Sequence, residues 1–398
     1  MLNLSLLELS ESITSGLTPL RSNDEFWNNG IIPWLKTEQL GEKYIFDTNE
    51  FISQKALDET SIKLNKENTL SIAMYGEGRT RGSVSILKNK MTTNQACCNV
   101  YLDDTKADYE YVYYFLKTQY DNLRSLSSGV RKNLNSNDIK NFRINIPKDI
   151  EEQKKIANVL SSLDSKIELN NKINKELEAM AKTLYDYWFV QFDFPDEKGK
   201  PYKSSGGKMV YNQELKREIP EGWEVKTLNT ITNIIAGGDK PKDFSEYQTS
   251  ELSIPIYSNG IENEGLYGFT NNARINNPSI TISARGTIGY CCLRFKPYLP
   301  IVRLISVTPK IQNQIVFFYQ AIKNLVFENS GSVQQQLTVP QVSELKIVLP
   351  PEFYLTKFEK IGILLFSKIE NIKQQNQELA KLRDWLLPML MNGQVKVK

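Results

Sequence analysis

The chain has 398 residues, of which 40% are hydrophobic and 24% charged, and it contains no histidine. This length corresponds to two or three domains at roughly 150 residues each. Ser-His-Asp and Cys-His triads and histidine-ligated metal sites all require an imidazole, so these classes of site are excluded. The 49 Lys and Arg residues nearly balance the 46 Asp and Glu residues, leaving a net charge of +3. Any contact with nucleic acid would therefore have to come from local basic patches.

The cysteines and the N-terminus bear on the cellular compartment. The cysteines form two adjacent pairs, Cys97–Cys98 and Cys291–Cys292. Adjacent cysteines lack the two-residue gap that lets both thiolates reach one zinc ion, so we expect buried, reduced thiols. The first residues, MLNLSLLELSES, lack the basic region and cleavage site of a signal peptide, and no apolar run reaches the ~20 residues that span a bilayer. We therefore expect a cytoplasmic protein with no membrane contact.

The first predicted region, residues 1–148, is globular. Short runs of β-branched and aromatic residues predict strands at 69–75, 83–87 and 143–146, and a helical pattern lies at 109–119. A long helix follows at 149–190, with carboxylates in its first turn. Residues 191–218 are rich in turn-forming residues and are predicted to be a linker.

The same order of elements then recurs. A second globular region at 219–350 has predicted strands at 279–283 and 346–349 and a helix at 314–323. A second long helix is predicted at 351–392, and a tail at 393–398. The sequence therefore predicts an α+β fold with two tandem globular domains, each followed by a long helix.

Direct comparison of the halves shows an internal repeat. The segment SGVRKNLNSNDIKNFRINIP at 128–147 matches GSVQQQLTVPQVSELKIVLP at 331–350 without a gap. Val130 aligns with Val333 and Pro147 with Pro350. A repeat of this length makes the two domains pseudo-symmetric copies.

Both long helices carry an apolar seam at heptad spacing. The first seam is Ile156, Leu160, Leu163, Ile167, Asn170, Asn174, Leu177, Ala181, Leu184 and Trp188. The second is Phe358, Ile361, Leu365, Ile369, Ile372, Asn376, Leu379, Leu382, Leu386 and Met389. Two tandem copies related by a two-fold axis place their helices head to tail, so we expect an antiparallel coiled coil. Asn174 and Asn376, equivalent in the repeat, are the predicted polar residues that fix its register.

Several motifs in this order resemble the specificity (S) subunit of type I restriction-modification enzymes, over essentially the whole chain. They are SGLTP at 15–19, LYDYWF at 184–189, IPEGWEV at 219–225, ARGTIG at 284–289 and the block from GSVQQQL to LPP at 331–351. The resemblance implies two target recognition domains, each reading one half of a bipartite DNA site. It also implies two methyltransferase (M) subunits docked on the helices, restriction/translocase (R) subunits for cleavage, and a role in phage defence.

Candidate DNA-reading residues lie on loops that the repeat relates. Residues 127–133 and 330–336 are the same loop in the two halves, basic in the first and rich in amides in the second. Arginine and lysine suit guanine or phosphate, whereas glutamine suits adenine. Two further loops carry basic or polar residues at 79–81 with 285–287, and at 240–242. The full candidate set is Arg79, Thr80, Arg81, Ser128, Arg131, Lys132, Asn133, Lys240, Lys242, Arg285, Thr287, Ser332, Gln334, Gln335 and Gln336.

No segment predicts an active site. The glycine-rich run at 76–82 leads into a strand, so no helix N-terminus follows to bind phosphate. Gly206-Gly207-Lys208 is followed by Met209, where a P-loop needs Ser or Thr. We therefore expect a non-catalytic subunit that itself binds no cofactor or metal. By the resemblance, S-adenosylmethionine, ATP and Mg²⁺ belong to the partner subunits.

Two other interpretations remain open. One is a coiled-coil scaffold, or an adaptor like those of toxin-antitoxin systems, that binds protein without sequence-specific DNA binding. The other is an enzyme with unrecognised carboxylate chemistry, for example at Asp196 and Glu214, although those residues have a loose spacing in a turn-rich segment. Specific binding of duplex DNA separates both from a specificity subunit.

Overall fold

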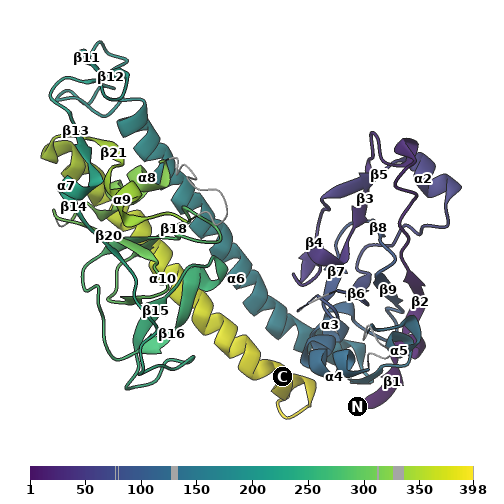
Figure 1. Cartoon of the computed structure of the whole chain (residues 1–398). Coiled ribbons are helices and arrows are strands. Elements are labelled where there is room, and N and C mark those ends of the chain that lie inside the picture. Colours follow the sequence, from purple (N-terminus) through teal and green to yellow (C-terminus); the bar gives the residue numbers. More distant parts are fainter. Residues whose placement is uncertain (77, 79, 127–132, 312, 326–335, 398) are drawn as a thin grey trace. The chain divides into compact units, whose positions relative to one another are not determined.

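The structure is a computed structural model that describes residues 1–76, 78, 80–126, 133–311, 313–325 and 336–397 (Figure 1). The chain forms two compact units. Unit 1 comprises Met1–Asn170 and Gln375–Lys398, and unit 2 comprises Asn171–Gln374. Each unit therefore contains one half of each long helix.

Unit 1 is built on a five-stranded sheet in the order β2-β9-β6-β7-β4, a three-stranded sheet β5-β3-β8 and the pair β1-β10. Its strands are β1 (Leu2–Ser5), β2 (Ser10–Ser15), β3 (Ile32–Leu35), β4 (Tyr44–Ile45), β5 (Glu50–Ile52), β6 (Leu70–Ala73), β7 (Val84–Leu87), β8 (Thr92–Thr93), β9 (Cys97–Leu102) and β10 (Arg143–Ile146). Its helices are α1 (Leu6–Leu9), α2 (Gln54–Glu59), α3 (Tyr109–Thr118), α4 (Tyr120–Ser125), α5 (Ser136–Lys140), the first part of α6 (Ile150–Tyr185) and the last part of α10 (Glu352–Met391). The strands and the helix predicted for this region are confirmed.

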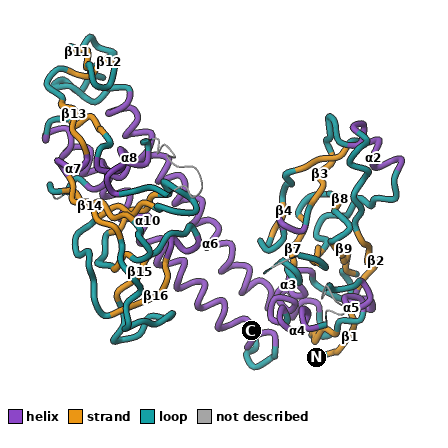
Figure 2. The backbone as a smooth tube through the Cα atoms, viewed as in Figure 1, coloured by secondary structure: helices purple, strands orange, loops and turns teal. Residues whose placement is uncertain are grey.

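Unit 2 repeats this order of strands, and Figure 2 shows that it also combines strands and helices. Its sheets are β14-β20-β17-β18, β16-β15-β19 and β13-β21, and it adds the hairpin β11-β12. The strands are β11 (Met209–Asn212), β12 (Arg217–Pro220), β13 (Glu224–Thr227), β14 (Thr232–Ala236), β15 (Ile254–Tyr257), β16 (Leu266–Thr270), β17 (Ser279–Ile282), β18 (Cys291–Arg294), β19 (Leu299–Pro300), β20 (Ile305–Pro309) and β21 (Lys346–Leu349). The helices are the last part of α6, α7 (Leu228–Ile231), α8 (Ile315–Lys323), α9 (Val339–Ser343) and the first part of α10 (Glu352–Met391).

The pairing of the short strands confirms the repeat. In unit 1, β3 pairs parallel with β8, and in unit 2 β15 pairs parallel with β19. In unit 1, β6 pairs antiparallel with β7 and β9. In unit 2, β17 pairs antiparallel with the equivalent strands, β18 and β20. The predicted α+β duplication is therefore present in the strand order itself.

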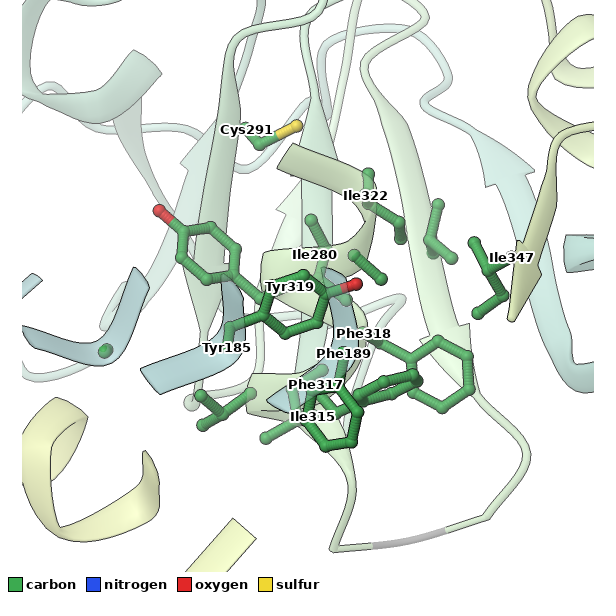
Figure 3. Packing of buried hydrophobic residues seen from close by; sticks show 14 of the residues in the cluster. Tyr185, Phe189, Ile280, Cys291, Ile315, Phe317, Phe318, Tyr319, Ile322 and Ile347 are labelled. Atoms are coloured by element: carbon green, nitrogen blue, oxygen red, sulfur yellow. The ribbon is translucent and has the colours of Figure 1, made fainter. Parts of the chain in front are cut away.

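The core of unit 2 is aromatic and surrounds α8 (Figure 3). Every residue of α8 from Ile315 to Ile322 is buried. The ring of Phe189 lies 5.0 Å from that of Phe317 and 5.0 Å from that of Phe358 in α10. Complete burial of such a side chain contributes roughly 1.5–3 kcal/mol. The long helices are therefore part of the core of this unit.

In unit 1 the long helices pair antiparallel. The Nδ2 of Asn170 donates a hydrogen bond of 2.8 Å to the Oδ1 of Asn376. The guanidinium of Arg383 lies 2.8 Å from the carboxylate of Asp164. The partner of Asn170 is residue 376 and that of Asp164 is residue 383, so the two helices run in opposite directions. This confirms the predicted antiparallel pairing. The end of α10 closes the core of this unit, where Leu390 and Met391 are buried with the first turns of α6.

The predicted seam needs correction at two positions. Ile361 and Leu382 were predicted in the seam but are exposed. An α-helix has 3.6 residues per turn, so a strict heptad stripe drifts around it. In unit 2, α10 also packs directly on α8, where a Cβ on Gly362 would meet the Val316 side chain at 2.7 Å.

The segment 191–218 is not a simple linker. Its residues Phe192 and Phe194 are buried in the core of unit 2, and the Phe194 ring stacks on Trp223 with centroids 4.9 Å apart. The hairpin of β11 and β12 follows. The two phenylalanines are surrounded in the sequence by many Lys, Gly and Pro residues, a composition that predicts a linker. The first helix also ends differently, because Asp186–Val190 form a π-helical turn after α6.

The four cysteines are free and buried, as expected. Burial raises the pKa of Cys97 and of Cys291 to about 12, so both thiols stay protonated near neutral pH. No helix among the described residues is long and apolar enough to cross a membrane.

Candidate nucleic-acid interface

In unit 2 the structure brings together two of the predicted loops. Arg285 lies on the exposed turn between β17 and β18. Its Nε and Nη2 donate to the Oε1 of Gln336, at 3.1 and 2.7 Å. The backbone fixes the same approach, because the N–H of Leu337 donates to the carbonyl of Ala284 at 2.9 Å. Arg285 and Gln336 therefore form one surface, and Thr287 is exposed on the same turn.

Unit 1 contains the same backbone contact. The N–H of Leu134 donates to the carbonyl of Met74 at 3.1 Å, at the position equivalent to Leu337 and Ala284. Asn133, a predicted reader, therefore lies beside the loop that carries Thr80 and Arg81. The duplicated fold thus juxtaposes the same two loops in each unit, with different side chains on them.

Thr80 and Arg81 are less accessible than the sequence suggested. Both are half-buried. Thr80 packs over Gly76, since a Cβ added to Gly76 would lie 2.7 Å from the Cβ of Thr80. It also lines a cavity of about 560 Å³ together with Lys117 and Tyr120. Gly82 packs against α4, where a Cβ would lie 3.0 Å from the Arg124 side chain.

The third predicted loop is also exposed, but its lysines differ. The ammonium of Lys240 lies 3.4 Å from the centroid of the Phe244 ring and 5.3 Å from that of Tyr267. This cation–π contact orients Lys240 within its own loop. Lys242 is exposed.

Asn259 is a residue of this surface that the sequence did not single out. Its Oδ1 accepts the N–H of Ala284 at 2.7 Å, and its Nδ2 donates to the carbonyl of Val302 at 2.6 Å. It thereby ties the Arg285 turn to the turn after β19. The only signal in the sequence is a Ser-Asn-Gly turn at 258–260, which is common in loops of every function.

A cluster of charges around the buried Arg294 of β18 is structural. Arg294 is 5% exposed, and its Nη1 lies 3.1 Å from the carboxylate of Glu264, which also binds Lys373. Burial opposes ionisation of Glu264, but the two cations hold its pKa below the usual value. Arg294 is therefore saturated by partners inside the unit.

Several predicted readers lie outside the described residues, and the structure does not bear on them. They are Arg79, Ser128, Arg131, Lys132, Ser332, Gln334 and Gln335.

Comparisons with known proteins agree with this architecture. The family model "Type I restriction modification DNA specificity domain" matches residues 4–179 and 220–381, one match for each half of the repeat. The MjaIX specificity subunit of a type I restriction enzyme from Methanocaldococcus jannaschii is 29% identical over 97% of this chain and 91% of its own length. The HindI specificity subunit from Haemophilus influenzae is 25% identical over 67% of this chain and 72% of its own length.

The fold has a counterpart among solved structures. The S subunit of a type I restriction-modification system from M. genitalium superposes with a TM-score of 0.61 at 20% identity, covering 98% of this chain and 95% of that one. At this identity the likeness concerns the fold alone. Because the family model covers most of the chain in two copies, the chain belongs to the family of type I restriction-modification DNA specificity subunits.

Proposed function

We propose that each unit reads one part of a bipartite duplex DNA target and directs partner subunits that methylate adenine or cleave the DNA. The observation that carries this proposal is the loop pair that recurs in both units. The backbone contact is the same, Leu134 to Met74 and Leu337 to Ala284, but the side chains around it differ. A duplicated scaffold with divergent loops suits the reading of two different half-sites.

The chemistry of the unit 2 loops suits base recognition. Arginine binds guanine through two parallel hydrogen bonds, and glutamine binds adenine in the same way. The Oε1 of Gln336 holds Arg285 through two of its N–H groups, which limits the motion of the guanidinium before DNA binds. Each bidentate contact with a base contributes about 1–3 kcal/mol of discrimination.

The long helices supply a surface for two methyltransferase subunits. Apolar side chains lie exposed on them, with Leu364 72% exposed in unit 2 and Trp385 58% exposed in unit 1. Leu364 and Trp385 lie on α10. On α6 the exposed residues include charged ones, namely Lys154, Lys155, Lys172, Glu176 and Lys182. Exposed apolar groups of this size are typical of protein interfaces.

This subunit would be non-catalytic within the complex. S-adenosylmethionine, ATP and Mg²⁺ would be held by the methyltransferase and the restriction/translocase subunits. The glycine-rich run at 76–82 supports this assignment, since it continues into β7 and provides no helix N-terminus for a phosphate. Defence against phage DNA follows from the role of such complexes.

The decisive experiment assembles the chain with its methyltransferase subunit and maps the methylated sites, with scrambled duplexes as the control and the salt concentration fixed. We expect one bipartite target. The Arg285→Ala variant should relax or lose one half-site and leave the other intact. Lys198 is exposed in the segment 191–218 of unit 2 and is not a candidate reader, so Lys198→Ala removes one charge as a matched control and should leave the map unchanged.

The same sample tests partner docking. Hydrogen exchange around the exposed residues of α6 and α10 should slow when the methyltransferase is added. Assembly without sequence-specific DNA binding would instead support a protein-interaction scaffold. Methylation by the chain alone would support an enzyme.

A further inference from the structure

The turn Ile301–Leu304 joins β19 to β20 in unit 2 and has an unusual backbone. The N–H of Leu304 donates to the carbonyl of Ile301 at 3.0 Å, which closes the turn. Both central residues have positive φ, 51° at Val302 and 60° at Arg303. Two successive positive φ angles are the signature of a type I′ turn.

The local sequence opposes this conformation. Type I′ turns select Asn-Gly or Gly-Gly, because these residues tolerate positive φ. A β-branched residue such as valine at positive φ is a genuine outlier. In unit 1 the equivalent turn, Asn94–Cys97, is closed by the same hydrogen bond at 3.1 Å, but its central residues do not have positive φ. The topology therefore does not require the strain seen in unit 2.

Neighbouring groups hold the strained turn in place. The N–H of Val302 donates to the carbonyl of Gly238 at 2.8 Å, and that of Arg303 donates to the carbonyl of Gly237 at 3.2 Å. Asn259 donates to the carbonyl of Val302 at 2.6 Å. Gly237 approaches so closely that a Cβ there would lie 2.7 Å from the backbone of the turn. Backbone strain that the surroundings fix in this way is concentrated at functional sites.

The side chains of the strained turn, in contrast to its backbone, have no visible structural use inside the unit. The side chain of Val302 is 50% exposed, and Arg303 is exposed as well. Within the described part of the chain, no hydrogen bond or ion pair engages the Arg303 guanidinium. The other positive-φ pair of unit 2, Asn263 and Glu264, differs, because the Glu264 carboxylate binds Arg294 and Lys373.

The turn adjoins the surface already described. Asn259 bonds with one end of its amide to the Val302 carbonyl and with the other to the N–H of Ala284, next to Arg285. The loop with Lys240 starts from Gly238, which accepts from Val302. The turn therefore lies between two of the candidate loops, the one that carries Lys240 and the one that carries Arg285.

We propose that the Val302–Arg303 turn determines the specificity of the half-site read by unit 2. Arg303 binds the edge of a guanine in the major groove, and Val302 contacts the methyl group of a neighbouring thymine. The inference rests on the proposed function and adds the residues that discriminate bases. The strained backbone presents both side chains outward at the same place.

The test is the double substitution Val302→Asn with Arg303→Gly, which installs the residues that the turn conformation favours. We expect the melting temperature to rise by about 2–4 °C, since the strain is relieved in a unit of this size. Methylation of the original target should fall about tenfold or more, and the preferred bases should change in only one half-site. Asn263→Gly is the matched control, because it relieves a positive φ away from the turn. It should also raise the melting temperature, but the methylation map should stay the same.

A conservative variant separates reading of bases from contact with phosphate. Arg303→Lys keeps the charge but loses the planar, bidentate donor pair. If Arg303 reads a base, this variant should accept additional bases in the half-site read by unit 2. An unchanged map for this variant, or an unchanged map and rate for the double variant, overturns the proposal. The proposed function fails separately, if the unaltered complex itself shows no preference among DNA sequences.

Discussion

Among single residues, Glu359 combines burial with a titratable group. It lies in α10, is 4% exposed, and accepts the backbone N–H groups of Val316 at 3.0 Å and Phe317 at 3.3 Å. These groups are at the N-terminus of α8, where a carboxylate satisfies N–H groups that the helix itself leaves unbonded. Burial nevertheless raises the pKa of Glu359 to about 7, and these hydrogen bonds oppose the rise only in part.

The stability of unit 2 should therefore depend on pH through Glu359. The ordinary pKa is 4.5, so between that value and about 7 the folded state holds the proton more tightly than the unfolded state. The contribution of the protonated group is complete below the lower value and is lost as the pH rises toward 7. The loss is of the order of 3 kcal/mol. Glu359→Gln should remove this fall, as measured by urea unfolding at pH 5 and pH 8.

Glu352, which is exposed in the first turn of the same helix, provides the control. The Glu352→Gln variant should keep the pH dependence of the unaltered protein. If Glu359→Gln and Glu352→Gln give the same slope of stability against pH, burial of Glu359 is not its cause.

At the scale of helices, the two seam asparagines have unequal roles. Asn376 is hydrogen-bonded to Asn170 within unit 1. Asn174 in unit 2 is 9% exposed, and its Oδ1 has no hydrogen-bond partner within the described residues. A buried unsatisfied polar atom costs about 1–3 kcal/mol. The two asparagines, equivalent in the repeat, therefore differ in their hydrogen bonding, and their role in setting the register stays a prediction.

Replacing each asparagine by leucine should have opposite effects on stability. Asn174→Leu removes an unsatisfied amide oxygen from the turn of α6 that carries the buried Leu177, and should raise the free energy of unfolding by about 1–3 kcal/mol. Asn376→Leu leaves the Asn170 amide without its partner and should lower it by a similar amount. Urea denaturation of the two variants measures both. Two changes of the same sign would show that the pairing of Asn170 with Asn376 does not decide the energetics.

The elements that the sequence predicted correctly are those with strong local periodicity. Strand β10 at Arg143–Ile146 and helix α3 at Tyr109–Thr118 were predicted nearly residue for residue, since their side-chain patterns match their burial. The repeat at 128–147 and 331–350 predicted the duplicated topology, because equal core positions require equal packing.

Features that depend on tertiary contacts escaped the sequence. Phe192 and Phe194 occur in a segment with the composition of a linker, and only the core of unit 2 gives them a place. Val302 and Arg303 adopt a turn that their own preferences disfavour, so no local pattern could predict it. The pairing of Arg285 with Gln336 was also beyond the sequence, although both residues had been assigned to candidate loops.

For the whole molecule, the continuity of α6 and α10 through both units bears on the DNA target. Each helix is a single element, Ile150–Tyr185 and Glu352–Met391, that contributes to the core of both units. If the units read separate half-sites, the helices set the length of unread DNA between them. An α-helix rises ~1.5 Å per residue and duplex DNA ~3.4 Å per base pair.

Insertion of one heptad in each helix, after Asn170 and after Ile372, therefore has a defined outcome. It keeps the seam in phase, leaves the Asn170–Asn376 contact within unit 1, and adds about 10 Å, or roughly three base pairs of spacer. Both half-sites should stay the same in the methylation map. An insertion of four residues adds about 6 Å and turns the seam out of phase, so it should also cost stability. Should the heptad variant fold and bind methyltransferase but modify only sites of the original spacing, the helices do not measure the DNA.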